Sequence, residues 1–456
     1  MTFQIVEIDG RPSVVLTDPN GVALPVVDSS VIPANTRALL ASGKDGQGVA
    51  RVLSATPLGN LLVAPSSYSR TAFGETRVAQ PFTVANLVNK YGIDPLHFGT
   101  SVSGGGAVSH IPLESAVRLS VPGTAGAYAK LRTHTYYRYQ AGKGLRVLQT
   151  GYRADTGNVN QRRAWGLADD NDGIFWRLNG TTHAIVRRTS TSGAPVEYVT
   201  NQSDWNVDKM DGSGPSGVTL DITKGNIFEF PLQWLGVGAV FFYINGHPVH
   251  VMENANQYAA PYIRTATLPL TWEIENIGAS TASSDTFICA TVIVEGGETT
   301  PVVAYGAYNP SDISVTTTER PLLSLRPSQL LNGIENRTAL IPNLALVNTD
   351  GSRAGFRVVM DGTLTGASWS SVGSWSGAEY DVSATAISGG DTLLRGFIPG
   401  NTDMREVDLS RFFSDFGRIL RRLAFTTDTN RLTITGQNLK AGTTAMSASL
   451  TWHEAH

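Results

Sequence analysis

The chain has a single cysteine, Cys289, among its 456 residues. A disulfide within the chain is therefore excluded, and the sequence fits synthesis in a reducing cytosol. The thiol lies in the strand-like run 287–292, and no histidine motif accompanies it. We expect a buried, inert side chain here rather than a nucleophile.

Charge is also scarce. Charged residues make up 16% of the sequence, whereas ordinary soluble proteins have about 25%. The formal net charge is -3, so the basic surface with which proteins neutralise nucleic-acid phosphates is missing. We expect an unusually uncharged surface and no nucleic-acid partner.

Long hydrophobic runs are missing as well. The longest apolar run, residues 234–244, contains Gly236 and Gly238 and is far shorter than the roughly 18 residues of a membrane helix. Residues 1–7 show no basic segment followed by an apolar core, so we expect neither an export signal nor a membrane partner. A hydrophobic content of 41% argues against disorder.

Short strand-like segments joined by turn residues dominate the sequence. Asn245-Gly246 separates residues 241–244 from 248–252 and suits a type I′ turn, because both residues tolerate positive φ. Asn179-Gly180 and Asp9-Gly10 repeat this pattern. The sequence therefore predicts an all-β protein of antiparallel sheets, arranged as sandwiches or barrels.

Composition divides the chain into three parts. Residues 1–68 are predicted to form an N-terminal arm or docking module with a small β content. Residues 69–320 hold five of the eight tryptophans, which is enough apolar mass for one large β-sandwich. Residues 321–456 are predicted to form a C-terminal β-sandwich. Helical spacing occurs in one window, residues 412–423, which predicts one short helix at most.

Catalytic and metal-binding templates fail along the chain. Residues 169–173 form an Asp-rich run that lacks the EF-hand ligand order, so an acidic turn is favoured over another kind of metal site. Glu273 and Glu275 lie two apart on one face of a predicted strand, which resembles a glycosidase carboxylate pair but also fits a half-buried strand. We predict no catalytic residues, no metal site and no cofactor.

Binding residues are predicted from aromatic side chains next to polar ones. Trp205 stands between Asp204 and Asp208 in a polar segment, and a tryptophan in such a setting can stack on a sugar ring. Core or interface packing is the favoured alternative for this residue. We group these three residues with Trp176 as candidates for contacts with a glycan or a protein interface.

The segments 161–176 and 203–217, with 45–53, 364–369 and 377–381, resemble virion proteins of tailed bacteriophages. This resemblance spans most of the chain. It implies a concanavalin-like or jelly-roll sandwich in a fibre, collar, decoration or other structural protein, and it carries over no catalytic residues.

Three functions are consistent with these observations. The leading hypothesis is a non-enzymatic structural part of a phage particle, fibre, collar, decoration or baseplate-associated, assembled in the bacterial cytoplasm. It would associate with its own copies as a trimer or ring, and with other virion proteins through the N-terminal region. The alternative is an adhesin that binds a host-surface glycan. The third is a polysaccharide depolymerase using Glu273 and Glu275.

Overall fold

The computed structural model describes most of the chain after residue 79 and four short strands before it. The chain separates into two compact units, Met1–Ser66 and Ser67–His456, which we describe separately. The described residues are 2–8, 11–17, 42–44, 50–52, 80–296, 303–336, 339–348, 352–399, 403–407, 409 and 420–455.

The first unit contains two antiparallel strand pairs. β1 (Thr2–Ile8) pairs with β2 (Arg11–Thr17) in a continuous register. This is the hairpin expected around Asp9-Gly10. β3 (Ser42–Lys44) pairs with β4 (Ala50–Val52).

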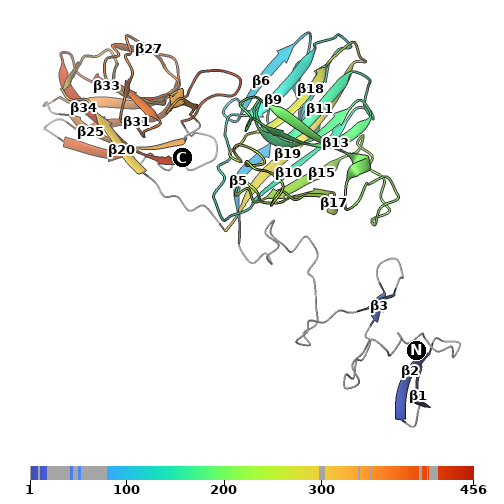
Figure 1. Ribbon diagram of the computed structural model, residues 1–456. Coiled ribbons are helices and arrows are strands. Elements are labelled where there is room, and N and C mark those ends of the chain that lie inside the picture. The colour runs from blue at the N-terminus through green and yellow to red at the C-terminus, as the bar shows by residue number, and fades with distance from the viewer. Residues whose placement is uncertain are drawn as a thin grey trace. The chain divides into compact units, whose positions relative to one another are not determined.

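The central sandwich consists of two antiparallel sheets (Figure 1). The eight-stranded sheet contains β5 (Pro81–Val88), β7 (Ala107–Ile111), β8 (Ala116–Val121), β10 (Leu145–Arg153), β15 (Asn226–Leu232), β16 (Val240–Ile244), β17 (His247–Met252) and β19 (Ser283–Glu295). The seven-stranded sheet runs in the order β14 (Val196–Asn201), β13 (Thr182–Thr189), β12 (Gly173–Asn179), β11 (Gln161–Ala168), β18 (Leu270–Asn276), β9 (Tyr128–Thr133), β6 (Phe98–Ser103).

Aromatic side chains fill the space between these two sheets. Trp272 of the seven-stranded sheet stacks on Phe287 of the eight-stranded sheet, with ring centroids 3.9 Å apart. Trp176 meets Phe242 edge to face at 5.4 Å. Such pairs contribute about 0.5–1.5 kcal/mol beyond the burial of their area. Of the five tryptophans that predicted a large sandwich, four are buried in its core and Trp234 packs against it partly buried.

The hairpin of β16 and β17 has the expected turn. Asn245 and Gly246 both have positive φ, 51° and 88°, as a type I′ turn requires. Asn179-Gly180 joins β12 to β13, and there Gly180 has the positive φ, 58°.

A second sandwich has a core of its own, which includes Leu346 and Trp452 from one sheet and Val358 and Ile434 from the other. Its five-stranded sheet contains β20 (Val303–Tyr308), β21 (Ile313–Val315), β25 (Ala339–Asn348), β32 (Asp403–Val407) and β34 (Thr444–Ala455). Its six-stranded sheet contains β22 (Arg320–Pro327), β26 (Ala354–Met360), β28 (Ser370–Ser371), β29 (Ala378–Asp381), β31 (Asp391–Ile398) and β33 (Leu432–Asn438).

Short elements complete the second unit. Two-stranded pairs are formed by β23 (Leu330–Leu331) with β24 (Ile334–Glu335) and by β27 (Thr363–Thr365) with β30 (Ala386–Ser388). Two 3₁₀ turns occur, η3 (Pro112–Glu114) and η4 (Gln202–Asp204). The part of the chain that the structure describes contains no α-helix.

The fold prediction is confirmed: the protein is all-β, with antiparallel sandwiches after a small N-terminal β module. The helical window 412–423 lies mostly outside the described residues. β20 and β21 precede residue 320 but pair with β34 of the C-terminal sandwich, so we propose that this part begins near residue 303. The remaining domain bounds stay predictions.

Two further expectations concern Cys289 and membranes. Cys289 is half-buried on β19 rather than buried, and its Sγ lies 3.0 Å from the Thr150 hydroxyl. Among the described residues there is no helix with the length and apolar character needed to cross a membrane.

Candidate functional site

The strands at the centre of the seven-stranded sheet have one apolar surface and one polar surface. Trp165, Trp272 and Leu131 lie directly opposite one another in register and are buried in the core. Side chains alternate along a strand, so their neighbours point to the other surface. We call this surface the outer face, and it comprises Lys130, Arg132, Arg162, Ala164, Gly166, Ala168, Phe175, Arg177, Arg188, Glu197, Thr271, Glu273 and Glu275.

Charged side chains flank a strip of small residues on the outer face. β11 contributes Ala164, Gly166 and Ala168, so the side chains in the middle of the face are shorter than those on either side. Gly166 is required there because a Cβ on it would lie 2.4 Å from the Cβ of Phe175. The adjacent strands carry charged residues on either side of this strip. Next to Ala164, for example, Glu273 and Lys130 lie on one side and Arg177 lies on the other.

Two carboxylates of β18 are paired with cations from the adjacent strands. Lys130 Nζ lies 3.2 Å from Glu273 Oε2, and Arg162 Nη1 lies 3.8 Å from Glu275 Oε1. The Glu273 side chain is 13% exposed and that of Glu275 is 29% exposed. Both carboxylates therefore sit on the outer face, as strand alternation predicts, and each has a positive neighbour.

Arg132 is the most buried cation of the outer face. Its guanidinium donates to both carboxylate oxygens of Asp170, at 2.7 and 3.1 Å, and to the Thr271 hydroxyl at 3.1 Å. Burial by itself would lower the pKa of Arg132, but the hydrogen bond and charge of Asp170 hold it above its usual value. This arginine is a rigid, permanently charged donor.

Glu197 on β14 is shared by two arginines. Arg177 donates to its two oxygens at 2.7 and 2.8 Å, and Arg188 donates to Oε1 at 2.8 and 3.1 Å. Burial raises the pKa of Glu197, but the hydrogen bonds and charges of the two arginines prevail and lower it to about 2. Glu197 therefore stays ionised and fixes both guanidinium groups over the sheet.

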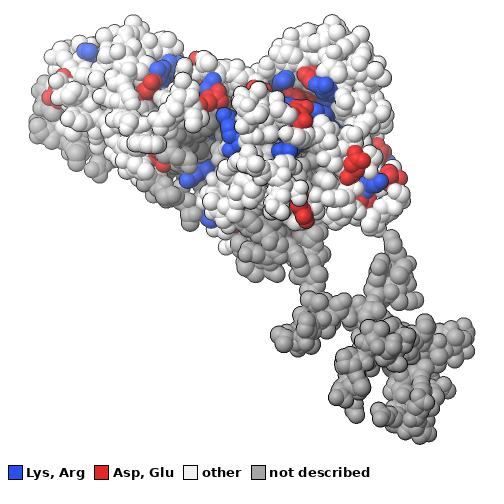
Figure 2. Space-filling view, in the orientation of Figure 1, with Lys and Arg blue, Asp and Glu red and all other residues white. Residues whose placement is uncertain are grey.

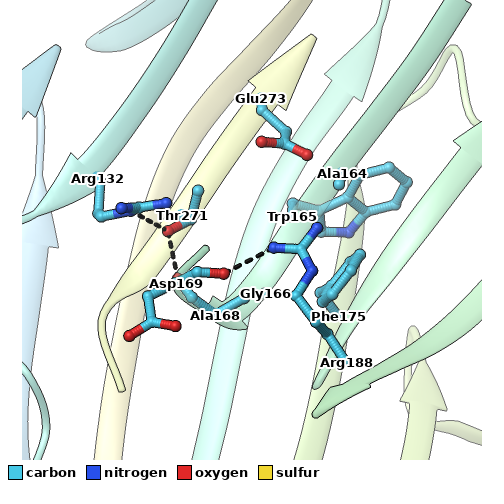
Figure 3. A pocket seen from close by; sticks show the side chains of 10 residues that line it. All are labelled: Arg132, Ala164, Trp165, Gly166, Ala168, Asp169, Phe175, Arg188, Thr271 and Glu273. Carbon is cyan, nitrogen blue, oxygen red and sulfur yellow. Dashed lines mark hydrogen bonds between the residues drawn. The ribbon is translucent and has the colours of Figure 1, made fainter. Parts of the chain in front are cut away.

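The low strip of β11 ends in a small depression (Figure 3). Arg188 closes one side of it, with its guanidinium 4.9 Å from the centre of the Phe175 ring and a hydrogen bond to the Asp169 carbonyl. The enclosed volume is about 10 Å³, which is about the room that one water molecule needs. A larger ligand would therefore lie across the outer face rather than inside it.

The chemistry of the outer face is that of fixed polar groups of both signs. On the side of the molecule drawn in Figure 2, blue and red atoms lie side by side in small groups among the white atoms of the described residues. Such a face offers donors and acceptors to a ligand rich in hydroxyl groups. Glu273 and Glu275 are two residues apart, so their Cα atoms are separated by about 6.6 Å at roughly 3.3 Å per residue. Glycosidases likewise use two carboxylates that face one substrate.

The structure places the predicted tryptophans in the core. Trp176 is 2% exposed and Trp205 is 3% exposed. Their rings meet edge to face, with centroids 5.9 Å apart. Neither offers a ring face to a sugar, because the ring is covered by other side chains of the sandwich.

The two predicted aspartates have different surroundings. Asp204 ends the turn η4 and is exposed. Asp208 is 3% exposed and accepts hydrogen bonds from the backbone N–H groups of Met210 and Ser216, at 2.8 Å each. Burial raises the pKa of Asp208, but hydrogen bonds from the Ser216 side chain and from the backbone of Met210 and Ser216 lower it overall. Asp208 therefore holds the loop 208–216 together.

The Asp-rich run 169–173 folds as a turn. Asp169 accepts from the backbone N–H groups of Asn171 and Asp172, at 2.8 and 2.9 Å. Asp172 accepts from Ser190 and from Arg264. No group of three or more His, Cys, Asp or Glu side chains suited to a metal ion occurs within the described ranges.

The sequence reasoning missed most of the outer face. Residues 128–133 alternate between small or apolar and polar side chains, and this pattern could have placed Lys130 and Arg132 on one surface. The sharing of Glu197 between Arg177 and Arg188 depends on the register of three strands, for which no short-range signal exists.

No protein-family model matches the chain, and no curated protein matches it in sequence. Solved structures similar to it include an endo-1,3-β-glucanase from Streptomyces sioyaensis, with 10% identity over 48% of this chain and 97% of that one and a TM-score of 0.33. A carbohydrate esterase from the Shiga toxin-encoding bacteriophage phi24B is 10% identical over 47% of this chain and 100% of that one, with a TM-score of 0.28. The alginate lyase AlyC3 is 8% identical over 41% and 78%, with a TM-score of 0.28.

At these identities the likeness concerns the fold alone. It nevertheless corrects one prediction: the chain was predicted not to be an enzyme, and the glucanase, lyase and esterase among its structural neighbours contradict that exclusion. That prediction rested on the absence of short catalytic motifs. A site assembled from side chains on several strands has no such motif.

Proposed function

We propose that the chain binds carbohydrate across the outer face of its seven-stranded sheet. The observation that carries this proposal is the arrangement of ion-paired side chains on both sides of the small residues Ala164, Gly166 and Ala168. A polysaccharide presents hydroxyl groups along a ribbon, and ion-paired side chains hold their hydrogen-bonding atoms in place before the ligand arrives. This preorganisation reduces the entropy lost on binding.

The test is a binding assay with the full chain. Electrophoresis through gels containing a neutral β-1,3-glucan or an acidic alginate measures the retardation of the protein by each polymer. We expect at least one polymer to retard the unmodified chain, and the double variant Glu273→Gln, Glu275→Gln to weaken that binding at least fivefold. Glu253→Gln, at an exposed position outside this face, is the control. Absence of retardation by any host-surface or model polysaccharide would refute the proposal.

A second candidate is polysaccharide cleavage at the same face. Glu273 and Glu275 favour it because both carboxylates lie on one surface of β18, next to the strip of small residues. Release of reducing ends from the same polymers measures this activity. Both Glu→Gln changes should abolish the release, and a chain that binds a polymer without releasing ends would exclude cleavage of that polymer while leaving the binding proposal intact.

We further propose that the chain acts as part of a tailed-phage particle, and that it associates there with its own copies and with other virion proteins. This proposal rests on the resemblance of the segments 161–176 and 203–217 to phage virion proteins. Electron microscopy of particles labelled with an antibody to this chain tests it. Labelling at head, neck or tail supports the proposal, and particles without label contradict it.

A further inference from the structure

The six-stranded sheet of the C-terminal sandwich has an outward surface with a different character. In β26, Phe356 and Val358 point into the core, so Gly355 and Arg357 lie on the outward side. Gly355 is opposite Phe397 of β31 and Gln437 of β33. In this cross-strand row, therefore, the position between the aromatic ring of Phe397 and the amide of Gln437 has no side chain.

Gly355 lines a pocket, and the Leu439 side chain lies beside it, 3.2 Å from where a Cβ of Gly355 would be. The pocket encloses about 230 Å³, slightly below the roughly 300–1,000 Å³ of sites for drug-sized ligands, so its size suits one small ring. Phe397 on β31 is 65% exposed, and Leu439, which directly follows β33, is 40% exposed. The pocket therefore has an apolar wall that is open to solvent.

The charges in the pocket are unequal. Arg357 makes a bidentate ion pair with Glu319, and Thr435 also donates to Glu319. Arg395 lies opposite Arg357 and lines the same pocket. Arg395 is exposed and has no hydrogen bond or ion pair with any residue that the structure describes. Glu319 is the one carboxylate among the described residues that line the pocket, and it interacts electrostatically with both arginines, so one positive charge remains in excess.

We propose that this pocket binds a single sugar ring that carries a carboxylate, a uronic acid unit of a polysaccharide. The ring of Phe397 packs against the C–H face of the sugar, because such a face is apolar while the sugar edges are polar. The guanidinium of Arg395 pairs with the carboxylate in the planar geometry that arginine favours. Gln437 lies on the other side of Gly355; its Nε2 donates to the Thr317 carbonyl, which holds the amide in place so that its Oε1 can accept from a sugar hydroxyl.

The pocket is a second site, separate from the outer face of the central sandwich. A neutral sugar would leave Arg395 unpaired, and a small inorganic anion would leave the Phe397 wall uncovered. A uronic acid satisfies both features at once, which is why we favour it over either. The proposal goes beyond carbohydrate binding at the outer face, and each site can fail without the other.

The first test compares two ligands that differ only in the carboxylate. Binding of methyl β-D-glucuronide and methyl β-D-glucoside to the full chain is measured by saturation-transfer NMR. We expect a Kd of the order of 1 mM for the glucuronide, as is reasonable for one small ring with about 4 kcal/mol of binding free energy, and at least tenfold weaker binding of the glucoside. Equal binding of both ligands, or binding of neither, would overturn the proposal.

The second test uses variants of the pocket. Arg395→Gln should remove the preference for the glucuronide, whereas Lys209→Gln, which removes an exposed charge elsewhere, should not. Phe397→Ala should weaken both ligands at least fivefold, whereas Tyr308→Ala should weaken neither, although Tyr308 is 66% exposed.

A steric variant keeps the proposal testable if those changes disturb folding. Gly355 does not have a positive φ, and a Cβ there would meet only the flexible Leu439 side chain, at 3.2 Å. Gly355→Val should fill the gap and abolish glucuronide binding while every charge remains. The Glu273→Gln, Glu275→Gln double variant should bind the glucuronide normally. Unchanged binding by Gly355→Val would place the ligand elsewhere and contradict the proposal.

Discussion

The outer face of the central sandwich and the pocket face of the C-terminal sandwich are built from the same element, an antiparallel sheet with one surface outward. On the first, the described cations Lys130, Arg132, Arg177 and Arg188 all have carboxylate partners, and the depression beside Arg132 and Arg188 encloses about 10 Å³. On the second, Arg395 has no such partner and the pocket encloses about 230 Å³.

The position of glycine explains much of this difference. Gly166 is opposite Phe175, whose backbone and Cβ fill the space above it. Gly355 is flanked by Phe397 and Gln437, and the atoms nearest to where its Cβ would be belong to the flexible Leu439 side chain. A glycine in a strand allows either close packing or a cavity, and the neighbouring side chains decide which of the two results.

The largest expected effect is the loss of stability when a core tryptophan, rather than a surface one, is replaced by alanine. Trp205→Ala should destabilise the central sandwich by about 3–5 kcal/mol, because a buried aromatic side chain leaves a cavity. Trp375→Ala should change stability by less than about 0.5 kcal/mol, because Trp375 is 72% exposed. Differential scanning calorimetry of the full chain measures both. A small effect of Trp205→Ala would restore the prediction that this residue is a surface platform for glycans.

The next effect compares the two glycines. A Cβ at Gly166 would lie 2.5 Å from Phe175 Cα and 2.6 Å from the Ile174 carbonyl oxygen, so the backbone must shift. Overpacking of this kind costs about 1–3 kcal/mol. Gly355→Ala should cost less than about 1 kcal/mol, because only the end of the Leu439 side chain must move. Urea denaturation followed by tryptophan fluorescence measures both variants, and equal costs would show that the two faces are packed alike.

The fold was largely predictable because its signals are local. Asn245-Gly246 suits a type I′ turn by residue type alone, and the structure has positive φ at both positions. Alternation also places Glu273 and Glu275 on one surface of a strand. These inferences need only a few consecutive residues.

The sites were less predictable because they depend on contacts between distant segments. Glu273 forms an ion pair with Lys130, which is 143 residues away in the sequence. Only the register of β18 with β9 brings the two side chains together. Trp205 has polar neighbours in sequence, yet it packs against Trp176 in the core. A polar local context indicates exposure on average, but the fold decides which side of a turn faces inward.

The smallest expected effect is a loss of stability at low pH. The pKa of Glu197 is lowered to about 2 by two arginines, although burial opposes this, and its usual value is 4.5. The stability that Glu197 contributes is therefore present above about pH 4.5 and is lost as the pH falls toward 2. Because its side chain is 30% exposed, we expect about 1–2 kcal/mol after solvent screening.

The carboxylate of the C-terminal sandwich provides the comparison. Burial raises the pKa of Glu319, but Arg357 and Thr435 lower it overall. Since Glu319 has one strongly bound arginine and Glu197 has two, Glu197→Gln should remove more of the stability difference between pH 6 and pH 3 than Glu319→Gln does. Thermal unfolding at both pH values measures this difference. A larger effect of Glu319→Gln would contradict this prediction. It would mean that the ion pair of Glu319 stabilises the fold more than the two ion pairs of Glu197 do.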